Sequence, residues 1–155
     1  MRKLFVLLFA VLLIASCGAS KTERHAQKTL KGDWTLNRIE LPSALVDVSL
    51  FEDADTRCFE YSEWNFISNN NKGSYQILKD NCNQGTRKFR WNIQENQNGE
   101  YYFTLKHEVD GINIRHQKRG FRLKLVSLDE NNMILEETTH HEGRPFVIRM
   151  SFSKN

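Results

Sequence analysis

Apolar and polar side chains alternate along most of the chain after residue 33. In one clear example, Phe89, Trp91 and Ile93 are separated by charged and amide side chains. The same alternation recurs in three further segments, 101–106, 121–125 and 146–152. Successive side chains of a β-strand point to opposite faces of a sheet. This pattern therefore predicts antiparallel strands with one buried face and one solvated face.

Turn-forming residues separate these alternating segments, for example at 96–99, 110–111 and 142–145. We therefore expect about eight strands, whose predicted first and last residues are accurate to within two to four positions. They are placed at 33–41, 57–67, 74–80, 87–95, 100–108, 119–128, 132–140 and 146–153. Short turns between neighbouring strands favour a meander. An eight-stranded antiparallel meander closes into an up-and-down barrel, because closure removes the exposed sheet edges. The predicted fold class is all-β.

Two connections are longer than the others. Residues 43–56 are apolar at first and acidic at the end, with Glu52, Asp53 and Asp55 in the acidic part. This segment is expected to hold a short helix or a flap across one mouth of the barrel. Residues 110–118 form the second long connection and are expected to be an exposed loop.

The first residues have the three-part plan of a secretory signal. Arg2 and Lys3 are followed by eleven apolar residues, Leu4 to Ile14. Eleven residues are too few for a membrane-spanning helix, which needs roughly 20. The sequence Ile-Ala-Ser-Cys that ends at Cys17 resembles the bacterial lipobox. That resemblance implies cleavage before Cys17 and lipid attachment to it; the alternative is an ordinary signal peptide with an incidental cysteine.

The lipobox resemblance also bears on domain organisation and location. We expect a signal peptide at 1–16, a lipidated polar tether at 17–31 and a barrel domain at 32–155. The residue directly after the cysteine is Gly18, which is not acidic. By analogy with lipoprotein sorting in Gram-negative bacteria, this favours a lipid anchor in the outer membrane, with the membrane face left open.

Two cysteines, Cys58 and Cys82, remain after Cys17. In an oxidising compartment such a pair is expected to form a disulfide. It would close a loop of about 25 residues, worth roughly 3.5 kcal/mol. The alternatives are a metal site and a catalytic thiol. A zinc site needs two more ligands at suitable spacing, and none is obvious.

Charge and motifs exclude several function classes. The net charge is +3, and it falls to +1 without Arg2 and Lys3, so the chain lacks the basic surface that nucleic-acid binding requires. We find no nucleophile elbow, zinc-protease helix or phosphate loop, and we expect neither an enzyme nor a cofactor.

Histidines and basic residues near the turns were weighed as further sites. A metal site at His140, His141 and Glu142 is less favoured than an exposed turn, because adjacent strand residues face opposite ways. His107 and His116 flank the 110–118 loop and could form a pH-sensitive or metal-binding pair. A basic cluster is read as a solvated strand face, or alternatively as a contact for lipid headgroups or an acidic partner. It comprises Arg115, His116, Lys118, Arg119, Arg122 and Lys124.

The Gly-x-Trp sequence at Gly32 and Trp34 resembles the opening motif of the lipocalins. The positions of further Cys, aromatic and Gly residues in 58–82 resemble the lipocalin-like lipoproteins of Bacteroidetes. The resemblance covers about 30–155. It implies that Gly32 and Trp34 lie at the closed base of the barrel and that an arginine near the last strand covers the Trp ring. Arg149 is the candidate, with Arg144 as second choice.

Inward-facing apolar residues suggest a ligand site. The candidate lining residues are Phe66, Trp91, Phe103, Phe121, Leu123 and Ile148. They could hold one small apolar molecule, or they could simply fill a solid core. The first hypothesis is thus a membrane-anchored protein that binds or transports a small apolar ligand. The alternative is a structural lipoprotein whose solid barrel docks another envelope protein. The oligomeric state stays open.

Overall fold

A computed structural model describes residues 21–42, 48–114, 120–141 and 143–155 of the chain. The predicted signal peptide and the lipid-attachment residue Cys17 lie outside the described residues. None of the described helices has the length and apolar character of a membrane span.

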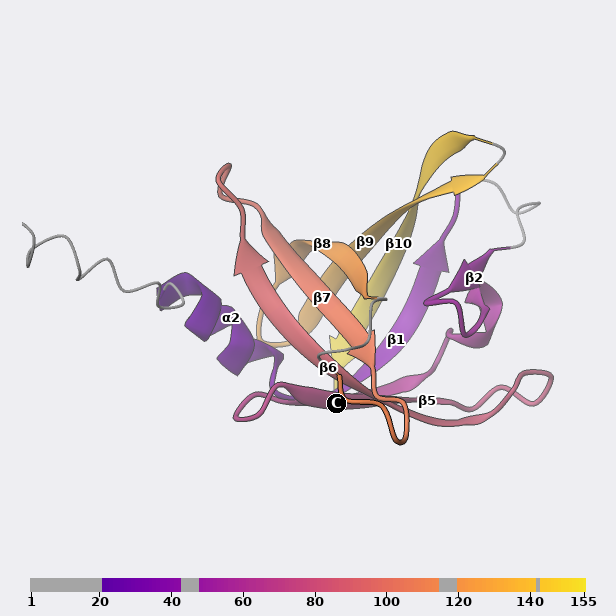
Figure 1. The fold of residues 1–155 in the computed structure, drawn as a ribbon. Helices are drawn as coiled ribbons and strands as arrows, with labels where there is room; N and C mark the ends of the chain where they lie inside the picture. The colour runs from indigo at the N-terminus through magenta and orange to yellow at the C-terminus, as the bar shows by residue number, and fades with distance from the viewer. Residues whose placement is uncertain (1–20, 43–47, 115–119, 142) are drawn as a thin grey trace, which may run out of the picture.

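Eight strands form a closed antiparallel barrel (Figure 1). They are β1 (Gly32–Glu40), β4 (Glu63–Ile67), β5 (Lys72–Ile77), β6 (Gly85–Glu95), β7 (Tyr101–His107), β8 (Phe121–Leu128), β9 (Asn132–His141) and β10 (Arg144–Lys154). Each strand pairs with the next along the chain, and β1 closes the barrel between β4 and β10. The predicted all-β, up-and-down barrel is confirmed, because the alternation of buried and exposed residues persists on the strands.

The predicted strand at 57–67 is wrong in its first half. Residues 49–55 form a small hairpin of β2 (Ser49–Leu50) and β3 (Ala54–Asp55), followed by a 3-10 turn, η2 (Thr56–Cys58). The Asp55 side chain accepts a hydrogen bond from the Arg57 backbone N–H and starts that turn. Tyr61 then adopts a left-handed backbone with φ 66°, and regular pairing begins only at β4.

The polar tether predicted for 17–31 is also corrected. Residues 21–30 form a helix, α2 (Lys21–Leu30), that contacts β6 and β8. The Glu23 carboxylate accepts a hydrogen bond from the Glu95 backbone N–H, and Gln27 donates to Asn92. Leu30 at the helix end is fully buried. A mostly polar sequence thus folds as a helix because one stripe packs against the barrel.

Trp34 lies buried at the base of the barrel, next to the end of α2. Its indole N–H donates a 2.8 Å hydrogen bond to the Leu30 carbonyl oxygen. Lys154 covers the ring, with the ammonium 5.2 Å from the ring centroid, and donates to the Thr29 carbonyl. Gly32 has φ +121°, which favours glycine, and a Cβ there would lie 3.2 Å from Lys154 Cε. We call this the closed end.

Arg149 does not cover Trp34, so that prediction is wrong. In the β1–β10 register Trp34 pairs with Lys154, whereas Arg149 pairs with Glu40 at the other end of the strand. The Arg149 guanidinium forms an ion pair with Glu136 on the outer face. Arg144, the second choice, is exposed at the start of β10. The cation at the closed end is a lysine from the chain terminus.

Aromatic rings fill the closed half of the barrel. Phe66 contacts both Trp91 and Phe103, with ring centroids 5.8 and 5.9 Å apart. Gly73 leaves room for the Phe89 ring, since a Cβ at this position would lie 2.4 Å from that ring. The closed half is therefore a packed core.

Candidate functional site

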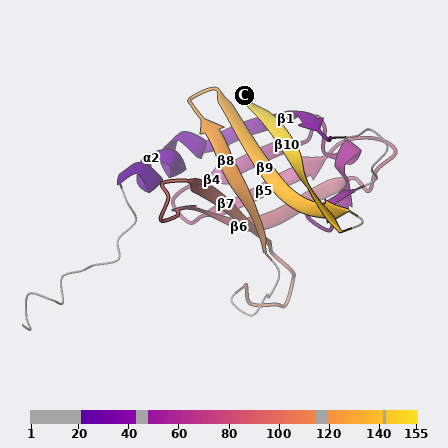
Figure 2. The same ribbon diagram turned by 90° about the horizontal axis from the view of Figure 1, so that it is seen from above.

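Three long connections and one short turn lie at the end of the barrel opposite Trp34. They are the chain between β1 and β4, the β5–β6 loop at 78–84, the β7–β8 connection at 108–120 and the β9–β10 turn. We call this the open end. Figures 1 and 2 show the first part of the β7–β8 connection projecting away from the barrel. Val109 and Ile112 are exposed on it, which confirms the expected exposed loop over its described part.

The β2–β3 hairpin places one aromatic ring in the open end. Phe51 is 3% exposed, and its ring lies 5.3 Å from Phe121 and 5.6 Å from Phe59, between centroids. Phe51 and Glu52 both have left-handed backbones, with φ 55° and 52°. Such a conformation costs roughly 1–2 kcal/mol per residue. The expected flap is thus a strained hairpin that inserts a ring, while residues 43–47 lie outside the described residues.

A polar network lies beside this ring. The Tyr75 hydroxyl donates a 2.7 Å hydrogen bond to Asp53, and Arg87 Nε lies 2.9 Å from the same carboxylate. His107 Nε2 is 2.8 Å from the Tyr75 oxygen. Because the phenol proton goes to Asp53, His107 donates through Nε2–H. Four elements, the hairpin and strands β5, β6 and β7, meet in this network.

Burial fixes the charge state of the network near neutral pH. Burial lowers the pKa of His107; the nearby Asp53 carboxylate opposes this effect and Arg87 adds to it. Burial and the bond to Asp53 raise the pKa of Tyr75. His107 and Tyr75 are therefore neutral at pH 7, and the charges of Asp53 and Arg87 cancel.

Glu137 of β9 brings a further carboxylate into the open end. It pairs in register with Ile148, which is 1% exposed, and it continues the inward alternation of Met133 and Leu135. Side chains of directly paired residues lie on the same face of a sheet, so Glu137 faces the interior. Its Oε2 atom is buried and has no hydrogen-bond partner in the described part of the chain. Burial raises the pKa of this carboxyl to about 7.

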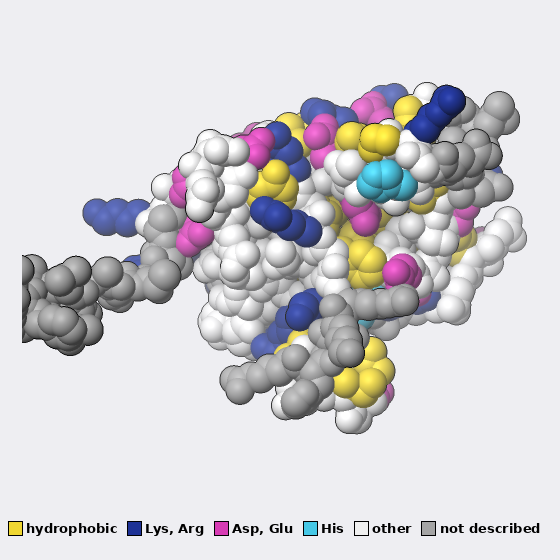
Figure 3. Space-filling view, turned by 45° about the horizontal axis from the view of Figure 1, so that its top comes forward, with side chains coloured by type: hydrophobic (Ala, Val, Ile, Leu, Met, Phe, Trp, Pro, Cys, Tyr) yellow, Lys and Arg dark blue, Asp and Glu magenta, His cyan; other side chains and the backbone are white. Residues whose placement is uncertain are grey.

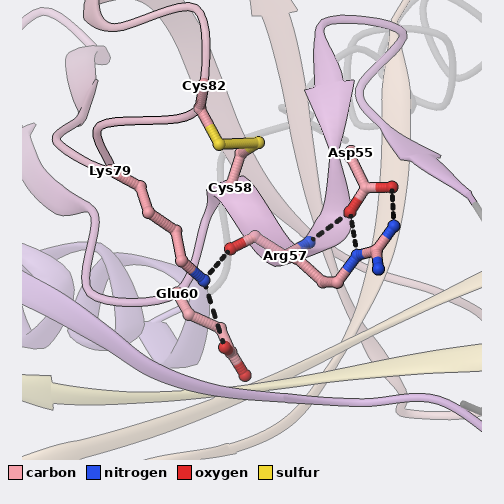
Figure 4. Close-up of polar contacts among 6 residues, drawn as sticks. All are labelled: Asp55, Arg57, Cys58, Glu60, Lys79 and Cys82. Carbon is pink, nitrogen blue, oxygen red and sulfur yellow. Dashed lines mark hydrogen bonds and ion pairs between the residues drawn. A yellow bond between two sulfur atoms is a disulfide. The ribbon is translucent and has the colours of Figure 1, made fainter.

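The predicted disulfide joins Cys58 to Cys82 and is confirmed (Figure 4). It connects the 3-10 turn to the β5–β6 loop. Lys79 adds a second connection, because its ammonium donates a 2.8 Å hydrogen bond to the Arg57 carbonyl and lies 3.8 Å from Glu60. The segment that carries Phe51 is therefore fastened to the rim at several points.

The six residues predicted to line a ligand site all lie inside the barrel, but in two groups. Phe66, Trp91 and Phe103 contact one another in the closed half. Leu123 pairs in register with Phe103 and lies at the same level of the barrel. Ile148 pairs with Glu137, and Phe121 is partly buried against Phe51 and His107. Of the six residues, the structure thus brings Ile148 and Phe121 next to the polar groups of the open end.

The remaining predicted sites gain no support from the described residues. No cluster of three metal-ligating side chains occurs among them. His140 is exposed, and the side chains of His141, Glu142 and His116 lie outside the described part. Of the basic cluster, Arg122 stacks over Tyr102 at 3.8 Å and Lys124 lies 2.6 Å from Glu100. These two side chains form part of a solvated strand face, and the other four lie outside the description.

Sequence reasoning missed Glu137, Arg87 and the role of Asp53. The period-two pattern carried a signal for two of them. Glu137 continues the series Met133, Leu135, and Arg87 precedes Phe89 on the same face. A charged residue in line with an apolar face is a candidate site, whereas the pairing of Asp53 depends on the hairpin and left no local signal.

No protein-family model matches the chain, and no curated protein matches it. Among solved structures, a lipocalin-like protein from Bacteroides uniformis is similar at 13% identity and TM-score 0.47, over 82% of this chain and 99% of that protein. Bovine odorant binding protein in complex with a selenium-containing odorant is similar at 13% identity and TM-score 0.43, over 83% and 72% of the two chains. Lobster apocrustacyanin A1 is similar at 13% identity and TM-score 0.45, over 88% and 71%. The closed eight-stranded antiparallel barrel is established by the strand pairing of this chain itself.

Proposed function

We propose that this protein is a lipid-anchored lipoprotein that binds one small amphipathic molecule at the open end of its barrel and is not an enzyme. The observation that carries the proposal is the difference between the two halves of the interior. The closed half is packed with rings, whereas the open half combines apolar side chains with polar groups that are partly buried, from Asp53, Arg87, His107 and Glu137, and with the buried Tyr75. A mostly apolar site with a few convergent polar groups is typical of small-molecule binding.

This proposal refines the ligand expected from the sequence. A wholly apolar molecule would need the deep interior, where Phe66, Trp91 and Phe103 are in mutual contact. An amphipathic molecule can instead place its apolar part against Phe121 and its polar part toward the network. Affinity would then come from apolar surface removed from water, at about 25 cal/mol per Å² before the costs of association.

The proposed anchor is Cys17 in the outer membrane, and it rests on the sequence before the barrel. The start of α2 at Lys21 bears on the orientation, because Lys21 lies only four positions after Cys17 in the chain. Four extended residues span no more than about 14 Å. The anchor would therefore join the barrel at its closed end, and the open end would be free to exchange ligand.

The anchor is tested by replacing the lipid-attachment residue. Cys17→Ala is expected to leave the protein unlipidated and to release it from membranes in cell fractionation. Gly18→Ala is the matched control and should keep the protein in the membrane fraction. Retention of the Cys17→Ala protein in membranes would contradict the anchor and leave the barrel site untouched.

Ligand binding is tested by native mass spectrometry of protein purified from its own host, followed by fluorescence titration with amphipathic molecules. A saturable mass shift is expected for the unchanged chain. Phe121→Ala should weaken binding, and Val126→Ala, which removes an exposed side chain on the same strand, should not. Absence of any bound or saturable ligand would contradict the proposal.

A second candidate function is docking of another envelope protein. An apolar groove of about 200 Å³ lies between α2 and β8 and includes Ala26, Tyr101 and Leu125 in its lining. It would lie close to the proposed anchor. Site-specific photo-crosslinking from Ala26 would detect such a partner in the envelope. Capture of one defined protein, together with no ligand at the open end, would favour docking over ligand binding.

A further inference from the structure

Two consecutive glutamates on β9 have opposite surroundings. Glu136 faces outward and forms an ion pair with Arg149, which is its register partner on β10. Glu137 faces inward, because its register partner Ile148 belongs to the buried core. One carboxylate is therefore neutralised on the surface, and the next enters the barrel.

Among the described residues, one oxygen of the inward carboxylate has no partner. Glu137 Oε2 is buried and accepts no hydrogen bond from them. Buried polar atoms are nearly always hydrogen-bonded, and an unpaired buried carboxylate is costly. An orphan acceptor inside a candidate binding site is explained most simply by a donor that arrives with the ligand.

Among the described residues, neither Arg87 nor Arg144 supplies that donor. The Arg87 guanidinium is held by Asp53 and by the carbonyl oxygens of Gly85 and Asn83. Arg144 is exposed at the start of β10 and pairs in register with His141, four positions beyond Glu137. The described groups around the open end therefore sum to one negative charge when Glu137 is ionised, since Asp53 and Arg87 cancel.

The described pairing of β9 with β8 ends one position before Glu137. Among the described residues, pairing of β8 with β9 starts at Lys124 and Glu136 and runs toward the closed end. From Glu137 onward, β9 keeps β10 as its described sheet neighbour. Figure 3 shows acidic and hydrophobic side chains next to each other on the face of the molecule that it presents. Glu137 therefore lies beyond the last described β8–β9 pair, on the side of the open end.

We infer that the ligand carries a cationic hydrogen-bond donor, such as a protonated amine, which binds the Glu137 carboxylate while its apolar part packs near Phe121 and Ile148. This inference rests on the proposed function, because it names the class of molecule bound at the same site. An anionic head group is disfavoured, since Arg87 is already neutralised by Asp53 and Glu137 would repel it. A neutral alcohol would satisfy the acceptor and leave the charge uncompensated.

The experiment uses three probes with the same apolar chain and different heads: octylamine, octanol and octanoate. Binding to the mature, disulfide-bonded chain is measured by calorimetry below the concentration at which the probes aggregate. Octylamine is expected to bind about tenfold or more tightly than octanol, and octanoate most weakly, as charge-assisted bonds are the stronger ones. Glu137→Gln should remove the preference for octylamine over octanol. Glu136→Gln, the matched control, should keep this preference.

The pH dependence gives an independent readout of the same contact. Binding of octylamine to the unchanged chain should strengthen as pH rises from about 6 to 8, because the carboxylate must ionise, and Glu137→Gln should flatten this profile. His107, Asp53, Arg87 and Tyr75 also face the open end and remain in the variant. A profile that survives Glu137→Gln would overturn the inference.

The outcomes distinguish a failure of this inference from a failure of the proposed ligand-binding function. If none of the probes binds saturably, both the inference and the proposed function fail. If octanol or octanoate binds as tightly as octylamine, the function stands and the inference fails. Should Glu137→Gln unfold the chain, Glu137→Met serves as the second variant, and its melting temperature shows that the fold is intact before binding is compared.

Discussion

The two ends of the barrel each bury an aromatic ring, but the surroundings of the two rings differ. At the closed end, Trp34 is buried under α2, its one polar atom is satisfied by Leu30, and Lys154 covers the ring. At the open end, Phe51 is also buried, but its backbone is left-handed and it lies beside a polar network. The closed end is arranged for stability. The open end keeps strain and an unpaired carboxylate, which are features of a site rather than of a core.

The largest loss of stability, and so the strongest test of this difference between the two ends, is expected at Trp34. Trp34→Ala should lower the free energy of unfolding by about 3–5 kcal/mol, because a large buried ring is lost and a cavity is left. The measurement is urea denaturation followed by circular dichroism. Phe121→Ala, at the open end, should cost less because its side chain is only partly buried. Equal losses would show that the two ends do not differ in packing.

The disulfide gives the next largest effect, and it acts on the open end alone. Replacing Cys58 and Cys82 together by Ser should lower the free energy of unfolding by roughly 3.5 kcal/mol under oxidising conditions. In the presence of a reductant, the variant and the parent chain should have the same stability. A loss that persists in reductant would indicate that the cysteines contribute through packing instead.

The pH dependence of stability sharpens the contrast at Glu137. Its folded pKa, about 7, is raised above the ordinary value of 4.5, so the folded chain binds more protons between these pH values. Stability should therefore fall as pH rises from about 4.5 to 7, by about 1–3 kcal/mol. Glu137→Gln should lose this fall, so its stability relative to the parent chain increases with pH. Denaturation curves at several pH values measure it, and a parallel course for both proteins would contradict the buried carboxylate.

The smallest effect is expected from the polar network. Asp53→Asn should destabilise the protein by about 1–2 kcal/mol, because it leaves the half-buried Arg87 without its counter-charge. Asp55→Asn, in the exposed pair with Arg57, is the control and should cost less than about 1 kcal/mol. Thermal melting of both variants measures the difference. An equal or larger loss of stability for Asp55→Asn would contradict the claim that the Asp53–Arg87 pair stabilises the open end.

The sequence predicted more of the fold than of the site. Period-two alternation located all eight barrel strands, because strand periodicity is local and each strand buries one face. It failed where a short-range interaction overrode the pattern. The Asp55 side chain starts a 3-10 turn in the first half of the predicted 57–67 strand, and α2 forms where a polar tether was expected.

The candidate site shows the same division. Six inward-facing lining residues were identified correctly as interior, but only the structure divided them between a filled closed half and an open half. Glu137 followed the alternation of Met133 and Leu135 and was readable as an inward residue. The sequence could not predict that Glu137 Oε2 has no hydrogen-bond partner among the described residues, because this depends on the side chains of every neighbouring element.

The sequence by itself determined the strand periodicity, the barrel class and the pairing of the two cysteines after Cys17. Only the tertiary structure decided that Lys154 rather than Arg149 covers Trp34, because strand register sets which residue reaches the closed end. It alone decided that Phe51 enters the open end and that Glu137 Oε2 is buried without a hydrogen-bond partner among the described residues. Periodicity and covalent pairing are properties of the chain, whereas a contact between distant residues exists only once register, closure and burial are fixed together.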